Sequence, residues 1–145
     1  MNVTVRSFKP GDRVEWLRMR KALWPDEEQE QDMDKALASD TDEVFFADRP
    51  GGGLCGLLVA RLHPWAEGCD STTVGYIEGW YVDEDMRRCG VGRALVEAAE
   101  AWARSRGCRQ MAWDAVLGNE VSHQAHGALG YEDIGRIVQF KKDLD

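Results

Sequence analysis

Glu78 and Asp114 are acids that stand in two segments whose remaining residues suit buried β-strands. A carboxylate inside a strand carries a desolvation cost, so it is usually paired or used for chemistry. Two such groups on neighbouring strands could bind an ammonium group and take a proton from it. The residue types also allow a simpler interpretation, in which the acids face solvent or pair with Arg87 or Arg109.

A second chemical feature is a segment with glycines and arginines that precedes a strongly amphipathic helix. It consists of Arg87, Arg88, Cys89, Gly90, Val91, Gly92 and Arg93. The peptide N–H groups at a helix start lack partners within the helix and carry a partial positive charge, which suits a diphosphate. Glycines let the backbone approach phosphates, and arginines add charge-assisted donors. The segment therefore predicts phosphate binding, with an ordinary glycine-rich loop as the alternative.

Two common nucleotide-binding motifs do not fit this segment. The GxxxxGK[ST] pattern of a P-loop is absent. A dinucleotide-binding fingerprint would need a third glycine and a short first strand near the N-terminus, and the sequence has neither.

The composition restricts the class of partner. The 145 residues suffice for one domain, which we expect to span residues 1–145. The formal net charge of −8 disfavours a nucleic-acid partner and is compatible with a cationic small molecule. No membrane span or secretory signal is visible, so the sequence predicts a cytoplasmic protein with no membrane partner. The cysteine spacing predicts no disulfide and no metal site for Cys55, Cys69, Cys89 and Cys108.

The hydrophobic pattern predicts an α/β fold with a mixed central sheet of about seven strands and four helices. The expected strands are Val3–Phe8, Val44–Ala47, Leu54–Leu62, Val74–Val82, Arg109–Ala115, Tyr131–Ile134 and Ile137–Lys141. The expected helices are Arg13–Leu23, Glu27–Ala38, a helix from Val91 to a stop at Gly107, and Asn119–Leu129. In the first helix, Val14, Leu17 and Ala22 are expected to face the core.

The pattern Arg87-x-x-Gly90-x-Gly92 resembles the acyl-CoA loop of the GNAT N-acetyltransferase superfamily, and the order of elements is similar over the whole chain. The resemblance implies the GNAT fold, with acetyl-CoA as the acetyl donor. It implies that the fourth and fifth strands splay apart and admit the pantetheine arm. The residues it implies for cofactor binding are Tyr81, Val82, Arg87, Arg88, Cys89, Gly90, Val91, Gly92, Arg93 and Asn119.

Several separate stretches resemble a narrower group, the aminoglycoside 6′-N-acetyltransferases. They are Leu23-Trp24-Pro25, Gly68-Cys69-Asp70-Ser71, Glu78-Gly79, the segment from Gly107 to Asp114, and Ala128-Leu129-Gly130-Tyr131. The resemblance implies a polycationic small-molecule acceptor, an aminoglycoside. Its binding residues would be Trp24, Trp65, Asp70, Glu78 and Asp114, with the two tryptophans as aromatic walls. We expect the remaining tryptophans in the core: Trp16, Trp80, Trp102 and Trp113.

The implied reaction is a direct attack of the amine on the thioester, for which positioning is the main contribution. Asp114 or Glu78 would first take a proton from the ammonium group, directly or through a water molecule. A backbone N–H near Val82 would stabilise the developing oxyanion. Many family members place a tyrosine near the end of the last helix to protonate the thiolate. His126 occupies that position here and would be the general acid.

Other interpretations stay open from the sequence alone. The same fold could accept another small amine, a polyamine or a protein N-terminus, or the chain could be a non-catalytic acyl-CoA- or drug-binding module. Similar enzymes are often dimers, so we expect a homodimer in which Ile137–Lys141 could offer a strand edge. His63 and His123 have no partner visible in the sequence, and we expect no role for either.

Overall fold

The computed structural model describes residues 3–115 and 117–144. The chain forms two compact units, Met1–Asp114 and Ala115–Asp145. The first unit contains the sheet, its covering helices and both predicted acids, and the second contains the last helix and the C-terminal segment.

The first unit is built on a sheet that, in the described residues, has five strands in the order β1-β2-β3-β4-β5. The strands are β1 (Val5–Ser7), β2 (Asp42–Asp48), β3 (Leu54–His63), β4 (Val74–Val82) and β5 (Met111–Trp113). Neighbouring strands are antiparallel except β4 and β5, which run parallel. The prediction of a mixed sheet is confirmed, and the bounds of β4 agree with the expected strand.

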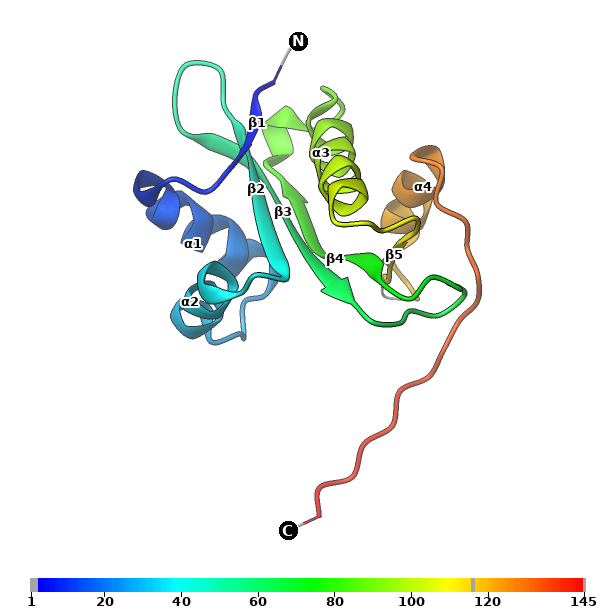
Figure 1. The fold of residues 1–145 in the computed structure, drawn as a ribbon. Helices are drawn as coiled ribbons and strands as arrows, with labels where there is room; N and C mark the ends of the chain where they lie inside the picture. Colours follow the sequence, from blue (N-terminus) through cyan, green and yellow to red (C-terminus); the bar gives the residue numbers. More distant parts are fainter. Residues whose placement is uncertain (1–2, 116, 145) are drawn as a thin grey trace. The chain divides into compact units, whose positions relative to one another are not determined.

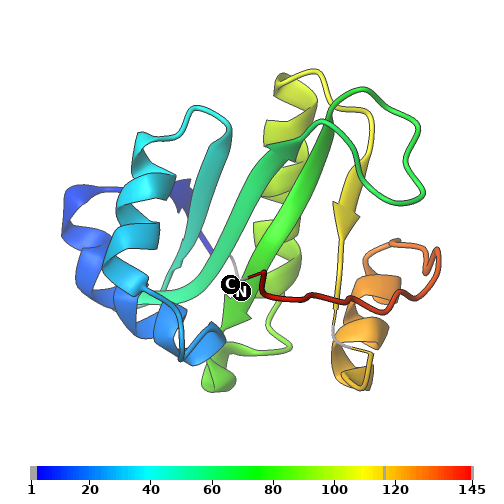
Figure 2. The same cartoon turned by 90° about the horizontal axis from the view of Figure 1, so that it is seen from below.

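Helices cover both faces of this sheet (Figures 1 and 2). One face carries α1 (Arg13–Leu23) and α2 (Gln29–Ala38), and the other carries α3 (Val91–Ser105). The glycines of the central strands permit this close packing, since a Cβ on Gly56 would meet Leu95 and Val91 of α3. A short 3-10 turn, Pro10–Asp12, leads into α1. Another, Glu84–Met86, follows β4.

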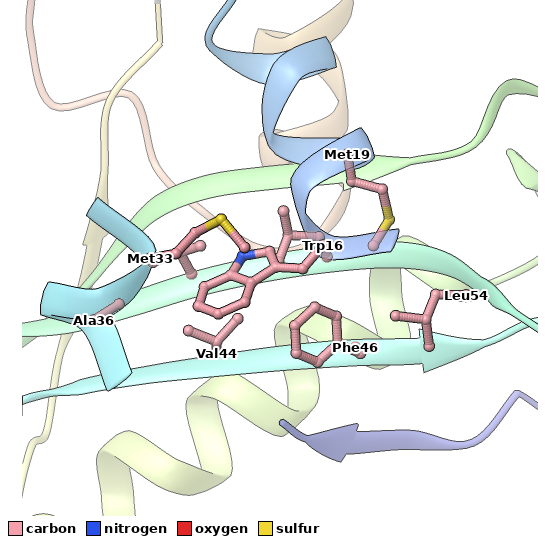
Figure 3. Close-up of a cluster of buried hydrophobic side chains, with 9 residues drawn as sticks. Trp16, Met19, Met33, Ala36, Val44, Phe46 and Leu54 are labelled. Atoms are coloured by element: carbon pink, nitrogen blue, oxygen red, sulfur yellow. The ribbon is translucent and has the colours of Figure 1, made fainter. Parts of the chain in front are cut away.

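The core between α1, α2 and the sheet is centred on Trp16 (Figure 3). Its ring lies 5.8 Å from that of Phe46 in an edge-to-face arrangement, which suits aromatic pairs. The buried members are Trp16, Met19, Met33, Ala36, Val44, Phe46, Leu54, Leu57 and Val59. The predicted inward face of α1 is wrong at Val14, which is 80% exposed, and at Ala22, which is also exposed, whereas Trp16 and Met19 point inward.

The strands β4 and β5 pair over a short length only. The paired residues are Gly75 with Met111, Tyr76 with Ala112, and Ile77 with Trp113. Strand β5 ends there, whereas β4 continues to Val82. The expected divergence of the fourth and fifth strands is therefore present, and it begins at Glu78.

The second unit contains α4 (Glu120–Ala128), which begins after Asn119. The Asn119 side chain accepts a hydrogen bond from the Ser122 N–H, as an N-cap residue does. The helix accounts for the predicted Asn119–Leu129 segment. No helix in residues 3–115 or 117–144 has the length and apolar character needed to cross a membrane.

The prediction of two strands at Tyr131–Ile134 and Ile137–Lys141 is wrong. The described residues 131–144 contain no strand or helix. Their alternating pattern is typical of a strand, but a strand is stable only when another strand pairs with it. Between the two expected strands there is a local contact, in which the Gly135 N–H donates to the Asp133 carboxylate at 3.1 Å. The sheet therefore has five strands rather than about seven.

Candidate active site

Glu78 projects from an irregularity in β4. Val59 of β3 pairs with Gly79, and the next β3 residue, Ala60, pairs with Ile77. Glu78 is therefore an extra residue in β4, a β-bulge of the kind that redirects a side chain near functional sites. The bulge follows directly on Ile77, the last β4 residue that pairs with β5, so the carboxylate projects where the pairing of the two strands ends.

The partners of Glu78 come from β3. The Nε2 atom of His63 lies 2.6 Å from Oε1 of Glu78, and Nη1 of Arg61 lies 4.0 Å from the same oxygen. Arg61 is itself held by the Asp42 carboxylate at 2.9 and 3.0 Å. Glu78 is thus half-buried and paired. The sequence showed no partner for His63, because Glu78 is fifteen residues away in the sequence and adjacent only in the sheet.

Asp114 follows the last residue of β5 and is exposed. Its Oδ2 atom accepts a hydrogen bond from the Tyr76 hydroxyl at 2.5 Å. Burial, together with this bond to a carboxylate, raises the pKa of Tyr76 well above its usual value, so the phenol stays a donor. The partners of the two acids are therefore His63, Arg61 and Tyr76, while Arg87 donates to the Val82 carbonyl at 2.9 Å.

The segment 87–93 forms the entrance to α3 as predicted. Gly90 is the N-cap residue and has φ +83°, a left-handed conformation that glycine adopts without strain. The first hydrogen bond of the helix runs from the Ala94 N–H to the Gly90 carbonyl at 3.0 Å. The N–H groups of Val91 and Gly92 precede it and point ahead of the helix, where an anion would meet them.

Gly92 has a packing role in addition to its expected closeness to phosphate. A Cβ at this position would lie 2.6 Å from Cζ2 of Trp80, a distance that side chains do not tolerate. The Trp80 indole N–H donates to the Gly92 carbonyl at 3.2 Å, and its ring meets Trp113 edge-to-face at 5.0 Å. Trp80 therefore fixes the first turn of α3 on β4, and Trp80 and Trp113, both expected in the core, are half-buried there.

Asp83 anchors the chain between β4 and the segment 87–93. Its N–H donates to the Cys55 carbonyl at 2.8 Å, and its carboxylate binds Arg18 at 2.8 Å and Arg49 at 2.8 Å. Burial of Asp83 would raise the pKa of its carboxyl group, but the arginine hydrogen bonds outweigh it and lower the pKa. Tyr81 also hydrogen-bonds this carboxylate. Sequence reasoning missed Asp83, since its partners lie 65 and 34 residues away.

The predicted acceptor-binding residues occupy different surroundings. Trp24 packs its ring on the backbone of Gly79, directly beside Glu78, with the Arg20 guanidinium 4.7 Å from the ring centroid. Trp65 is 61% exposed in the loop between β3 and β4. Asp70 lies in the same loop, where its backbone N–H donates to Oε1 of Gln110 at 3.0 Å.

Gln110 is a functional candidate that sequence reasoning did not single out. Its Oε1 atom accepts from the Asp70 N–H and from both the N–H and the hydroxyl of Ser71. Gln110 immediately precedes β5, so one side chain ties the exposed loop to the strand that leads to Asp114.

Asn119 and His126 belong to the second unit. Asn119 caps α4, and the His126 ring lies 3.4 Å from the Ser122 hydroxyl. Their roles toward the cofactor and the leaving group stay predictions. Cys89 lies in the segment 87–93, with its sulfur 3.5 Å from the Arg87 carbonyl.

Three features are typical of an acyl-transfer class of protein. They are a sheet in which two strands stop pairing, a helix start whose N–H groups can bind an anion, and two acids held by hydrogen bonds. The acetyltransferase (GNAT) family model matches residues 12–131, and the chain belongs to this family. Within it, the chain is similar to the aminoglycoside N(6′)-acetyltransferase type 1 of Stenotrophomonas maltophilia, 38% identical over 144 residues, which cover 98% of this chain and 94% of that protein.

Two further relatives agree with this similarity. The aminoglycoside N(6′)-acetyltransferase type 1 of Klebsiella aerogenes is 40% identical over 146 residues, covering 97% of this chain and 96% of that protein. Among solved structures, AAC(6′)-Iy in complex with the bisubstrate analogue CoA-S-monomethyl-acetylneamine aligns with a TM-score of 0.92 at 31% identity, covering 99% of each chain. The expected GNAT membership is thereby confirmed.

The Asp83 ion pairs should make stability depend on acid pH. Because the pKa of Asp83 is lowered on folding, its stabilisation is present above about pH 4, the unfolded pKa, and is lost as the pH falls through the folded pKa. We expect Asp83→Asn to lower the free energy of unfolding by about 2 kcal/mol at pH 7, less than for a fully buried pair because both arginines are partly exposed.

Urea unfolding at pH 7, 5 and 3 measures this effect. The difference in free energy of unfolding between wild type and Asp83→Asn should narrow below about pH 4, where the carboxylate gains its proton in the unfolded chain, and should be lost as the pH falls through the lower folded pKa. Asp26→Asn, in an exposed turn, is the matched control and should match wild type at each pH. A difference that stayed constant from pH 7 to pH 3 would contradict the assignment.

The contact between Gly92 and Trp80 gives a second prediction. Gly92→Ala should displace the first turn of α3 and weaken coenzyme A binding about tenfold, since overpacking of this kind costs on the order of 1–3 kcal/mol. Isothermal titration with coenzyme A measures the change. Gly11→Ala, where a new Cβ meets no atom within 4 Å, is the control and should leave the Kd unchanged. Equal Kd values for all three proteins would exclude this role of Gly92.

Proposed function

We propose that the protein transfers the acetyl group of acetyl-CoA to the 6′-amine of an aminoglycoside. The observation that carries this proposal is the similarity to aminoglycoside N(6′)-acetyltransferases over nearly the full length of both chains. The chemistry of the site supports it, because an aminoglycoside is a polycation and Glu78 and Asp114 offer negative charge beside the gap between β4 and β5.

The donor is held, in this proposal, at the start of α3. The N–H groups of the first helical turn and the arginines of the segment 87–93 bind its diphosphate. Gly90 and Gly92 bring the backbone close, and the pantetheine arm lies in the gap between β4 and β5, beside Tyr81 and Val82. Acetyl-CoA supplies an acetyl group activated as a thioester.

The acids prepare the acceptor. Glu78 or Asp114 binds the ammonium group and takes its proton, directly or through a water molecule, so that the amine nitrogen gains a free electron pair. The C–N bond then forms as the C–S bond breaks, and a backbone N–H near Val82 stabilises the charge on the carbonyl oxygen. His126 is the proposed proton donor to the departing thiolate.

The aromatic side chains and Asp70 complete the acceptor site. Trp24, fixed on Gly79, is a rigid wall next to Glu78. The exposed Trp65 offers a ring face to a cationic sugar, and Asp70 in the same loop adds negative charge. Gln110 orders this loop through its three hydrogen bonds.

The proposal treats residues 1–145 as one acetyltransferase domain, because the family match from residue 12 to 131 includes parts of both units. We place its action in the cytoplasm, and the four free cysteines suit such a reducing compartment. We also propose a homodimer. Its support is the exposed apolar side chains of the C-terminal segment, in which Phe140 is 90% exposed and Val138 is 77% exposed.

The proposed base gives a direct prediction. Asp114→Asn should lower kcat for tobramycin by about a hundredfold or more, since general-base catalysis typically contributes that much. Coenzyme A binding should change little, because the diphosphate site lies at α3. Steady-state kinetics and NMR of the acetylated product measure activity and the acetylated position. Asp40→Asn, an exposed acid, is the control.

Two results would oppose this account. An Asp114→Asn enzyme with wild-type turnover would remove Asp114 from the base role and leave Glu78 as the candidate. Acetylation of spermidine or peptides, but of no aminoglycoside, would overturn the proposed acceptor.

The dimer gives a separate prediction. Phe140→Asp should shift the chain from dimer to monomer in sedimentation velocity, because a charge in a buried apolar contact must be desolvated. Gln139→Asp places the same charge on the neighbouring polar residue and is the matched control. The proposed contact fails if wild type sediments as a monomer or if Phe140→Asp dimerises as wild type does.

A further inference from the structure

In the first unit two side chains, His63 and Tyr76, connect the two acids Glu78 and Asp114 through direct contacts. Glu78 contacts His63, with 2.6 Å between Oε1 and Nε2. The ring of His63 stacks on that of Tyr76, with centroids 4.3 Å apart and planes within 10° of parallel. The Tyr76 hydroxyl then donates to Asp114 at 2.5 Å. Glu78 and Asp114 thus lie at the two ends of one aromatic stack.

The register of the sheet explains why these residues meet. His63 pairs with Val74, so Tyr76 is its diagonal neighbour two residues along β4, a distance that rings can span. Tyr76 is held at its ring by His63, and its hydroxyl reaches from β4 to the end of β5. Residues from three successive strands therefore converge: His63 at the end of β3, Tyr76 and Glu78 within β4, and Asp114 just after β5.

The connection restricts both carboxylates. A carboxylate on a bulge, such as Glu78, or just past a strand end, such as Asp114, would otherwise sample several rotamers. Each is instead fixed by one hydrogen-bonding group, and the two groups are fixed to each other by ring stacking. Proton removal needs the base within hydrogen-bonding reach of the amine, so the spacing of the acids matters for the rate.

We infer that Tyr76 and His63 are positioning residues for acetyl transfer, Tyr76 acting through Asp114 and His63 through Glu78. This inference rests on the proposed function of the two acids. Neither residue needs to touch the acceptor. The stacked pair sets the direction of each carboxylate and the spacing between them, and a supporting side chain of this kind can change turnover without changing the fold.

A double-mutant cycle tests the inference for Tyr76. Tyr76→Phe keeps the ring and its stacking but removes the bond to Asp114. It should lower kcat/KM for tobramycin about tenfold to a hundredfold and leave the KM for acetyl-CoA unchanged. In an Asp114→Asn background the same substitution should cause no further loss, because its partner has already lost the carboxylate. Additive losses, or wild-type activity of Tyr76→Phe, would overturn the inference.

His63→Gln tests the other end of the connection and remains informative if Tyr76→Phe proves unstable. It should lower kcat/KM for the amine, and this loss should disappear in a Glu78→Gln background. His123→Gln is the matched control, because His123 lies on α4 with its ring 3.7 Å from the Glu120 carboxylate, and it should retain wild-type kinetics. A merely structural role would lower the melting temperature and alter the KM for acetyl-CoA as well.

Failure of the inference is distinguishable from failure of the proposed function. If wild type acetylates no aminoglycoside, the proposed acceptor is wrong, and the cycle can be repeated with whichever amine releases coenzyme A thiol. If wild type acetylates tobramycin but the Tyr76 and His63 variants match it, the proposed function stands and the positioning role is excluded.

Discussion

The site depends on how β4 is held by aromatic packing on both of its faces. On one face Trp80 lies under Gly92, so the first turn of α3 is seated on the strand. On the other face Trp24 lies on Gly79, immediately after the bulge that projects Glu78. Three consecutive residues of β4 therefore relate the helix start, which suits a diphosphate, to the carboxylate, which suits an amine. Any substitution that moves β4 changes both halves of the reaction geometry together.

In the first unit some carboxylates form ion pairs that support the fold, while other carboxylates remain able to bind a cation. Asp83 with Arg18 and Arg49 closes the turn after β4, and these arginine hydrogen bonds lower the pKa of its carboxyl group despite its burial. The acids of the site hydrogen-bond to a histidine at Glu78 and to a phenol at Asp114. Arg61 lies 4.0 Å from Glu78 but directs its two hydrogen bonds to Asp42, so neither acid of the site receives a two-pronged arginine bond and both can still attract a cationic acceptor.

The sequence predicted those parts of the fold that depend on local patterns. The bounds of α1 and β4 and the glycine-led start of α3 follow from periodicity, Pro25 and Gly90. The prediction of two strands from Tyr131 onward was wrong, because an alternating pattern of apolar and polar residues does not indicate whether a partner strand is available. The sequence singled out the two acids, but it did not predict the contacts that hold them. The Glu78 bulge, His63 and Asp83 all depend on pairing between distant strands, which one sequence does not reveal.

The most direct measurement is a crystal structure of the protein with coenzyme A. We expect the diphosphate oxygens within about 3 Å of the N–H groups in the first turn of α3. We expect the thiol in the gap between β4 and β5, on the side where Glu78 and Asp114 project. A nucleotide bound at another place, or a thiol remote from both carboxylates, would contradict the coupling of donor and acceptor sites through β4.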